Sequence, residues 1–318
     1  MSRSRAAGGL FAASAVVAVS LLGAAPASAA TLPSGATIDV VEQDGGIYSV
    51  NPATAVGTLI GTESSVFDVT AIDVNQSGQG FAIAQGEGTS YLYAANAVAG
   101  TITEIAEILD GGESIQGCQG IDLSNANVLT VSCAGFTGSG FFVSVIGFVD
   151  PLTGAFDEIT DYSTLDDDIV RALASNSAGT LYYITELGRS YTLNTTTGVS
   201  TPGAEIDGRV LAADFDVTDQ LWVTIGVEGE DNPDPNGLGT LNVATGVLTP
   251  IAGYSSADTE SFSTVSITVW GGSLAATGSN GQEFVPLAIG AVLLLLAGVA
   301  LAVTHRISHR RRNHHPTS

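Results

Sequence analysis

The sequence lacks most of the side chains on which common enzyme mechanisms depend. It contains no lysine, its one methionine is the first residue, and all four histidines lie near the end of the chain, at His305, His309, His314 and His315. The preceding part of the chain therefore cannot build a Ser-His-Asp relay, a lysine Schiff base or a His-ligated zinc site. Carboxylate, hydroxyl and aromatic chemistry is what remains.

Positive charge is also scarce. All nine basic residues are arginines, and only Arg171, Arg189 and Arg209 lie within residues 30–273. That segment holds every acidic residue except Glu283, which gives it 31 acids, three bases and a net charge of −28. Because binding to phosphates needs several cations to displace counterions, we expect no nucleic-acid partner.

Both ends of the chain carry targeting patterns. Residues 1–29 combine a basic start, a run of Ala, Val and Leu, and small residues at the end, which predicts a secretory signal peptide. Residues 284–304 form an apolar run that is long enough to span a bilayer. The arginine-rich tail at 305–318 predicts that this end lies in the cytoplasm.

A pentapeptide and a polar spacer, 279–283, precede the apolar span. The pentapeptide consists of Leu274, Ala275, Ala276, Thr277 and Gly278. The order of pentapeptide, spacer, span and basic tail resembles the cell-wall sorting signal of Gram-positive surface proteins, in the LAxTG form that is similar to substrates of class E sortases in actinobacteria.

This resemblance implies that a sortase cuts between Thr277 and Gly278 and joins Thr277 to a peptidoglycan amine. Ala275 stands where proline is usual in the better-known pattern. The alternative is an uncleaved membrane anchor in which the pentapeptide is a loop next to the membrane. Both interpretations place residues 30–273 outside the cell, in the wall or on the outer face of the plasma membrane.

A turn signature recurs five times between the two ends. It begins at Asn51, Asn96, Asp150, Asn194 and Asn242, at intervals of 45, 54, 44 and 48 residues. Each copy ends in glycine, taken as Gly57 in the first, and most have alternating β-forming residues on either side. An Asx residue and a glycine at these positions favour a β-hairpin, and the period is that of a four-stranded propeller blade.

The signature and the strands before it predict an all-β, five-bladed β-propeller at residues 30–273. The segment after Thr37 lacks an innermost strand, whereas Ser266–Trp270 is an innermost strand with nothing after it. Joining the two would complete the fifth blade and close the ring. The alternative is six blades, with one hidden between Asn96 and Asp150. The repeat style resembles divergent propellers of bacterial surface proteins and of the NHL and lactonase-like groups, and this resemblance implies no active-site residue.

The two cysteines, Cys118 and Cys133, fall on the two arms of one predicted hairpin. Their midpoint coincides with the expected turn, which places them opposite each other on one face. In an exported chain we expect them to form a structural disulfide.

Three acids, Asp73, Asp122 and Asp216, recur at what the sequence suggests are equivalent places in the inner strands. If they converge on the axis, they could serve glycoside cleavage as an acid and a base or nucleophile. The competing interpretation is that each one caps a turn by accepting backbone N–H groups.

An acidic insertion at residues 228–237 offers oxygen ligands of the kind that calcium takes. The candidate ligands are Glu230, Asp231, Asn232, Asp234 and Asn236. Their spacing does not match an EF-hand loop, and the two prolines favour an extended acidic surface loop. No other cofactor is expected.

Three functional hypotheses follow. The first is a non-catalytic surface propeller that binds a glycan, peptide or wall protein; the second is a carboxylate-based glycoside hydrolase; the third is a calcium-stabilised structural domain. Only Gly271–Ser273 separate the last strand from the sorting pentapeptide, a reach of roughly 10 Å. The propeller should therefore lie close to its point of attachment.

Overall fold

The computed structural model describes residues 31–272 except for 44, 63–67, 87, 137–141, 163–167, 227–236 and 257–263. The described residues form 23 β-strands, and they include no helix long and apolar enough to cross a membrane. The predicted signal peptide, sorting pentapeptide, spacer, span and tail lie outside the described residues. So do all five candidate calcium ligands.

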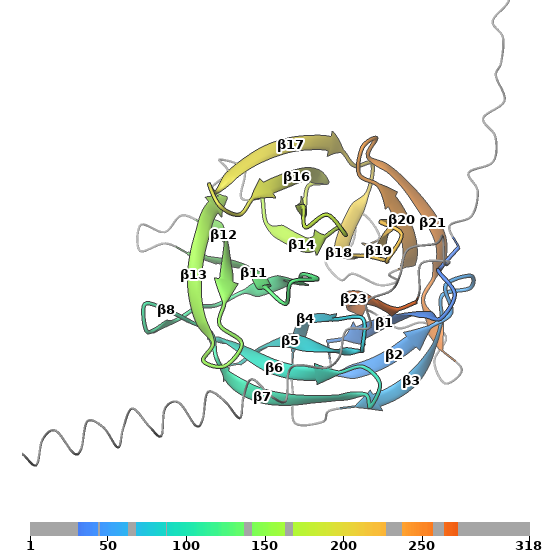
Figure 1. Ribbon diagram of the computed structural model, residues 1–318, viewed down its shortest axis with the longest axis horizontal. Helices are drawn as coiled ribbons and strands as arrows, with labels where there is room; N and C mark the ends of the chain where they lie inside the picture. Colours follow the sequence, from blue (N-terminus) through green and yellow to red (C-terminus); the bar gives the residue numbers. More distant parts are fainter. Residues whose placement is uncertain are drawn as a thin grey trace, which may run out of the picture. The chain divides into compact units, whose positions relative to one another are not determined.

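Five antiparallel sheets stand around a common axis as the blades of a propeller (Figure 1). In each of the first four blades, the strands follow one another from the axis outward in chain order. The first blade is β4 (Val69–Val74), β5 (Gln79–Gln85), β6 (Ser90–Asn96) and β7 (Thr101–Glu107); the second is β10 (Cys118–Leu123), β11 (Leu129–Phe136), β12 (Phe142–Val149) and β13 (Ala155–Tyr162); the third is β14 (Val170–Ser175), β15 (Leu181–Thr185), β16 (Arg189–Asn194) and β17 (Val199–Glu205); the fourth is β18 (Arg209–Phe215), β19 (Leu221–Gly226), β20 (Gly237–Asn242) and β21 (Val247–Gly253).

The closing blade combines strands from both ends of the described segment. Its strands, from the axis outward, are β23 (Thr264–Gly271), β1 (Ala36–Glu42), β2 (Gly46–Val50) and β3 (Val56–Thr62). β23 pairs antiparallel with β1, and Val269 lies opposite Ile38. The predicted closure by the C-terminal strand is therefore confirmed, and with it the five-bladed arrangement.

Two short additions cover the outer edges of blades. β8 (Leu109–Asp110) forms a small hairpin with β9 (Glu113–Ser114) and pairs in parallel with β13, while β22 (Ser255–Ser256) pairs in parallel with β3. The longest interval between turn signatures thus contains an edge-covering hairpin and no sixth blade. Such cover removes a strand edge that another chain could otherwise join.

Burial depends on the position of a strand within its blade. The innermost strand β4 has five of six residues buried, whereas the outermost strand β17 has none. Apolar side chains of adjacent blades pack together, as Ile83 and Leu92 of the first blade do with Ile121 and Val131 of the second. Because burying each such side chain stabilises by about 1.5–3 kcal/mol, the junctions between blades supply much of the stability.

The recurring turn signature forms the hairpin between the two outer strands of every blade. Its Asx side chain accepts a hydrogen bond from a backbone N–H two or three residues later. Ala53 N donates to Asn51 Oδ1 at 2.9 Å, and Leu152 N donates to Asp150 Oδ1 at 2.8 Å. The first copy differs from the prediction. Ala55, with φ 54°, is its left-handed residue, and Gly57 lies inside β3.

The glycine of this signature also fits the blade against its predecessor. At Gly100, Gly154, Gly198 and Gly246, an added Cβ would lie 1.9–2.8 Å from the backbone of the preceding blade's outermost strand. At Gly246 the nearest atom is the carbonyl oxygen of Glu205. The glycine of the repeated signature is therefore required by a contact between blades as well as by the turn.

Replacing Gly246 by alanine should destabilise the protein more than the same change at Gly179. Gly179 also has a positive φ, but nothing lies within 4 Å of an added Cβ there. We expect losses of about 1 kcal/mol for Gly179→Ala and about 2–4 kcal/mol for Gly246→Ala, measured by urea unfolding. Equal losses for the two variants would show that the Gly246 contact is unimportant.

Candidate functional site

Five side chains share one level around the axis. The strand registers place Asp73, Asp122, Ala174, Asp214 and Thr268 at the same position of the five innermost strands. Three acids therefore converge on the axis, but they are not the three that the sequence suggested.

Asp216 does not belong to this level. It lies two residues after Asp214, in the turn between β18 and β19, where its Oδ1 accepts the N–H of Thr218 at 2.8 Å and of Gln220 at 3.1 Å. Its Oδ2 accepts the indole N–H of Trp222 at 3.0 Å. Asp216 is thus a turn cap, and its expected equivalence to Asp73 and Asp122 is wrong.

Each axial acid accepts a backbone N–H from the innermost strand of the next blade. Leu123 N donates to Asp73 Oδ2 at 2.5 Å, and Ser175 N donates to Asp122 Oδ1 at 2.6 Å. Asp73 and Asp122 therefore link neighbouring blades and do not cap their own turns.

The same pattern continues around the ring. Val269 N donates to Asp214 Oδ2 at 2.5 Å, and Val74 N donates to Thr268 Oγ1 at 3.1 Å. Ala174 offers no oxygen, so the junction between the third and fourth blades lacks this link. Because an innermost strand has no further strand beside it, these side chains satisfy N–H groups that would otherwise be left unpaired.

Proximity and burial make the axial acids weak acids. Asp73 and Asp122 are 5% and 3% exposed. Burial and the charge of Asp122 raise the pKa of Asp73 to about 8, and burial raises the pKa of Asp122 to about 6. Burial and the charge of Asp73 raise the pKa of Asp214 well above its usual range. Asp73 therefore holds a proton at neutral pH, whereas Asp122 is mostly ionised there.

The cavity on the axis, lined by residues that precede the acids in the innermost strands, is small. The cavity lined by residues such as Gly120, Ala172, Ala212 and Ser266 has a volume of about 10 Å³. This is too small for a sugar ring and at the limit for one water molecule. Among the described residues, no group of three or more His, Cys, Asp or Glu side chains is placed to hold a metal ion.

A ring of β-bulges marks the upper face, defined here as the face on which the innermost strands begin. In each of these strands one residue near the start has no partner in the register of the neighbouring strand, and its side chain is half-buried. The bulged residues are Thr70, Gln119, Arg171, Leu211 and Val265. A bulge re-aims a side chain, so the fold presents these five side chains together. Sequence reasoning missed this ring.

Two of the three arginines in residues 30–273 meet on this face. The Nη2 of Arg171 lies 3.0 Å from Glu186 Oε2, and the Nη2 of Arg209 pairs with Glu186 Oε1. Arg171 Nη1 also donates to Gln119. The cluster joins the third blade to the fourth, at the junction where the axial level has alanine. The Nη1 of the third arginine, Arg189, lies 3.7 Å from Oδ2 of Asp168.

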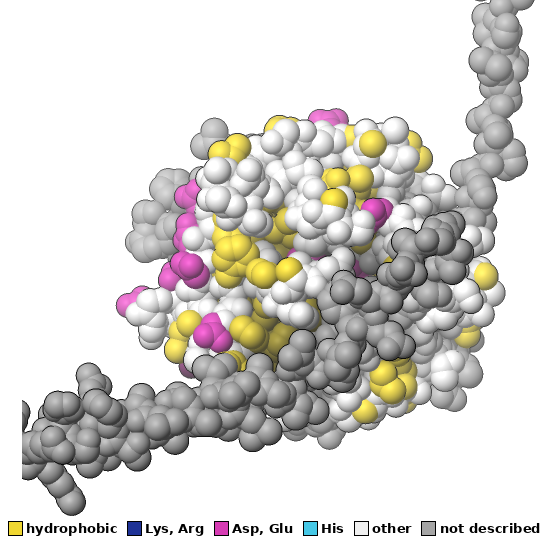
Figure 2. Space-filling model, in the orientation of Figure 1, with side chains coloured by type: hydrophobic (Ala, Val, Ile, Leu, Met, Phe, Trp, Pro, Cys, Tyr) yellow, Lys and Arg dark blue, Asp and Glu magenta, His cyan; other side chains and the backbone are white. Residues whose placement is uncertain are grey.

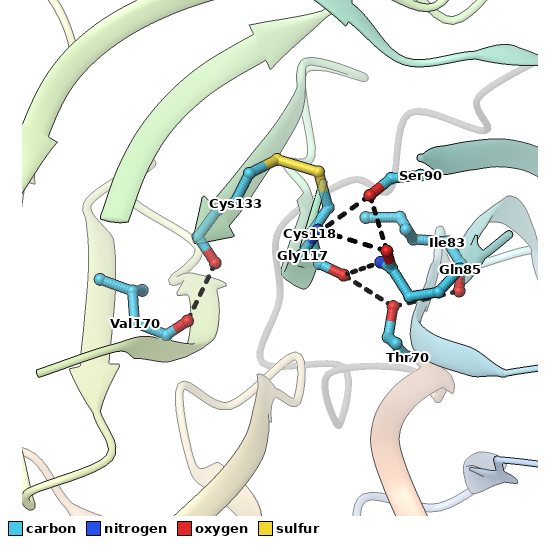
Figure 3. The surroundings of a disulfide bond; sticks show 9 residues. Thr70, Ile83, Gln85, Ser90, Gly117, Cys118, Cys133 and Val170 are labelled. Atoms are coloured by element: carbon cyan, nitrogen blue, oxygen red, sulfur yellow. Dashed lines mark hydrogen bonds between the residues drawn. A yellow bond between two sulfur atoms is a disulfide. The ribbon is translucent and has the colours of Figure 1, made fainter. Parts of the chain in front are cut away.

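The disulfide between Cys118 and Cys133 is confirmed, and it connects residues directly opposite each other on β10 and β11. Figure 3 shows how the first blade surrounds it. The carbonyl oxygen of Cys118 accepts hydrogen bonds from Thr70 Oγ1 at 2.7 Å and from Gln85 Nε2 at 2.9 Å. The backbone N–H of Cys118 donates to Ser90 Oγ at 3.2 Å. The bond is buried and has a structural position at the junction of two blades.

Outside the axis, acidic side chains gather along the β13 edge of the face in Figure 2. A larger hollow of about 610 Å³ lies over the β16–β17 hairpin. Threonines form most of its lining, and Asn194 and Val199 also line it. It contains no charged side chain and no aromatic ring. It therefore offers mainly hydroxyl groups to a ligand.

Comparison with known proteins shows no family. No protein-family model and no curated protein matches the chain. A protein of unknown function from Bacteroides caccae aligns with 12% identity over 68% of this chain and 72% of that one, with a TM-score of 0.42. TolB from Acinetobacter baumannii aligns with 10% identity over 68% and 52%, with a TM-score of 0.43. The chain spans about half the length of TolB.

The axial acids predict that stability falls as pH rises. Their pKa values are higher in the folded state than in the unfolded state, so their contribution is fully present below about pH 4 and is lost as pH rises through about 6 to 8. We expect Tm to fall by on the order of 5 °C between pH 5 and pH 9.

Asp73→Asn should reduce that fall, because its side chain cannot ionise. Asp157→Asn, which removes an exposed acid from β13, is the matched control for net charge. The measurement is calorimetric Tm against pH for the three proteins. The assignment to the axial acids would be wrong if both variants kept the slope of the unmodified protein.

Proposed function

We propose that this chain is an exported surface protein whose propeller binds a wall-proximal ligand without catalysis. The geometry at the axis is the observation that supports binding without catalysis. The acids that could act on a glycan are committed to bonds between blades, and the cavity on the axis, lined by residues that precede the acids in the innermost strands, is about 10 Å³. The upper face, with its ring of bulged side chains, is left as the surface for a ligand.

The first half of the proposal rests on the sequence. A signal peptide at 1–29, the LAATG pentapeptide, the apolar span and the basic tail stand in the order that sortase substrates require. The propeller contributes one consistent detail. β23 ends at Gly271, at the end of the ring opposite to the face on which the innermost strands begin.

The hydrolase alternative has one observation in its favour. The carboxyl pKa values of about 8 and 6 at Asp73 and Asp122 are split, as in many acid–base pairs. Glycoside cleavage needs two carboxylates about 5–10 Å apart that face a cavity open to a sugar. The cavity on the axis, at about 10 Å³, is too small for a sugar, so binding is the function the geometry supports best. Calcium stabilisation stays a prediction, since its candidate ligands lie outside the described residues.

Mass spectrometry of muramidase-released wall fragments tests the anchoring. We expect a chain that ends at Thr277 and is joined through its carbonyl to a peptidoglycan amine. Thr277→Ala should move the protein from the wall fraction to the membrane fraction. A chain that extends through residues 284–304 in both proteins would instead establish the uncleaved membrane anchor.

Insoluble wall that has not been digested with muramidase separates binding from hydrolysis. The full-length chain in detergent should sediment with added insoluble wall fragments, while the number of reducing sugar ends stays constant over time. A rise in reducing ends that Asp73→Asn abolishes would support the hydrolase and overturn the non-catalytic proposal.

A further inference from the structure

The upper face is divided into a polar half and an apolar half. Among the five bulged residues, Thr70, Gln119 and Arg171 are polar, whereas Leu211 and Val265 are apolar. Because all five lie at the same position of neighbouring strands, the two halves adjoin each other around the axis. A ligand on this face would touch both.

The polar half carries an excess of positive charge. Arg171 and Arg209 share the one carboxylate of Glu186, which leaves one positive charge without a counter-charge in the cluster. The segment around it has a net charge of −28. Among the described residues of the upper face, this cluster is therefore where an anion would be attracted.

The cluster also has an unused hydrogen-bond donor. The bonds of Arg209 use only Nη2, so within the described part of the chain its Nη1 has no protein acceptor. The Nε atoms of Arg171 and Arg209 also lack a partner among the described residues, but both atoms are buried and are not open to a ligand. The Arg209 side chain is 25% exposed, so its Nη1 is the group that can donate a charge-assisted hydrogen bond to a ligand carboxylate.

An apolar surface lies directly beside Arg209. A Cβ added to Gly226, at the end of β19, would lie 3.2 Å from Cδ of Arg209 and 3.3 Å from Cδ2 of Leu211. The two side chains thus lie over the same glycine. A group bound by the Arg209 guanidinium would have the isobutyl side chain of Leu211 next to it.

We propose that the upper face binds a ligand carboxylate that has a small apolar group next to it. Arg209 and Arg171 hold the carboxylate, Gln119 supports Arg171, and Leu211 contacts the apolar group. The C-terminus of a short peptide that ends in a small apolar residue has this chemistry. The inference rests on the proposed function, because it specifies the ligand of the same face.

Titrations of the full-length chain in detergent test this site, with N-acetyl-Ala-Ala as the probe and NMR or calorimetry as the readout. The same peptide with a C-terminal amide should bind at least tenfold more weakly. Arg209→Gln should weaken binding of the acid at least tenfold, and Arg189→Gln should change it less than twofold. Equal binding of acid and amide, or unchanged binding by Arg209→Gln, would overturn the proposal.

Two further arms exclude a purely structural role and identify the source of the carboxylate. Glu186→Gln removes the internal competitor, so it should strengthen binding of N-acetyl-Ala-Ala severalfold even if it lowers Tm; a lower Tm without stronger binding would count against the site. Weaker binding of glucuronate is expected, because it lacks the apolar group, and would assign the carboxylate to a peptide. Equal binding of glucuronate would show that Leu211 contributes no contact and would overturn the proposal.

Failure of this inference is distinguishable from failure of the proposed function. If no carboxylate probe binds but the full-length chain still sediments with wall fragments, the carboxylate site is wrong and the wall-binding role stands. If the chain also fails to sediment with wall fragments, the proposed binding function is itself wrong.

Discussion

The whole structure depends on the pairing of β23 with β1, which joins strands from opposite ends of the described chain. Without that pairing, the closing blade would lack its innermost strand, and Ser266 and Thr268 could not bond to β4 of the first blade. Closure also gives every blade two neighbours, so that each innermost strand can be buried on both faces. The axis and the upper face exist only because the ring is complete.

Closure creates a second problem, which the axial acids solve. Five innermost strands turn an open edge toward the axis, and their N–H groups need acceptors. Short carboxylates at Asp73, Asp122 and Asp214 supply them, and Thr268 does so in the closing blade. The same arrangement crowds carboxyl groups together and raises their pKa values. A cluster that has the electrostatics of an active site is therefore explained by its role in holding blades together.

Sequence reasoning predicted what is local or periodic: the blade repeat, the closing strand and the pairing of Cys118 with Cys133. It failed where the answer depends on register. Asp216-Val and Asp73-Val look alike in the sequence, yet only pairing with the neighbouring strand shows that Asp214 is the residue at the level of Asp73. The bulges behind Arg171 and Leu211 add one residue to one strand, and no turn or periodicity signals them. Hence the axial acids were partly predicted, and the upper face was not.

Native-state hydrogen exchange of the β1 amides tests the closure most directly. In a closed ring, the N–H groups of Val40 and Ile38 lie between β2 and β23, so they should exchange only through global unfolding, as slowly as those of Ile83 and Val131 in blades far from the junction. Exchange of the β1 amides through a low-energy local opening, while Ile83 and Val131 stay protected, would show that the ring is open at this point and would contradict the account.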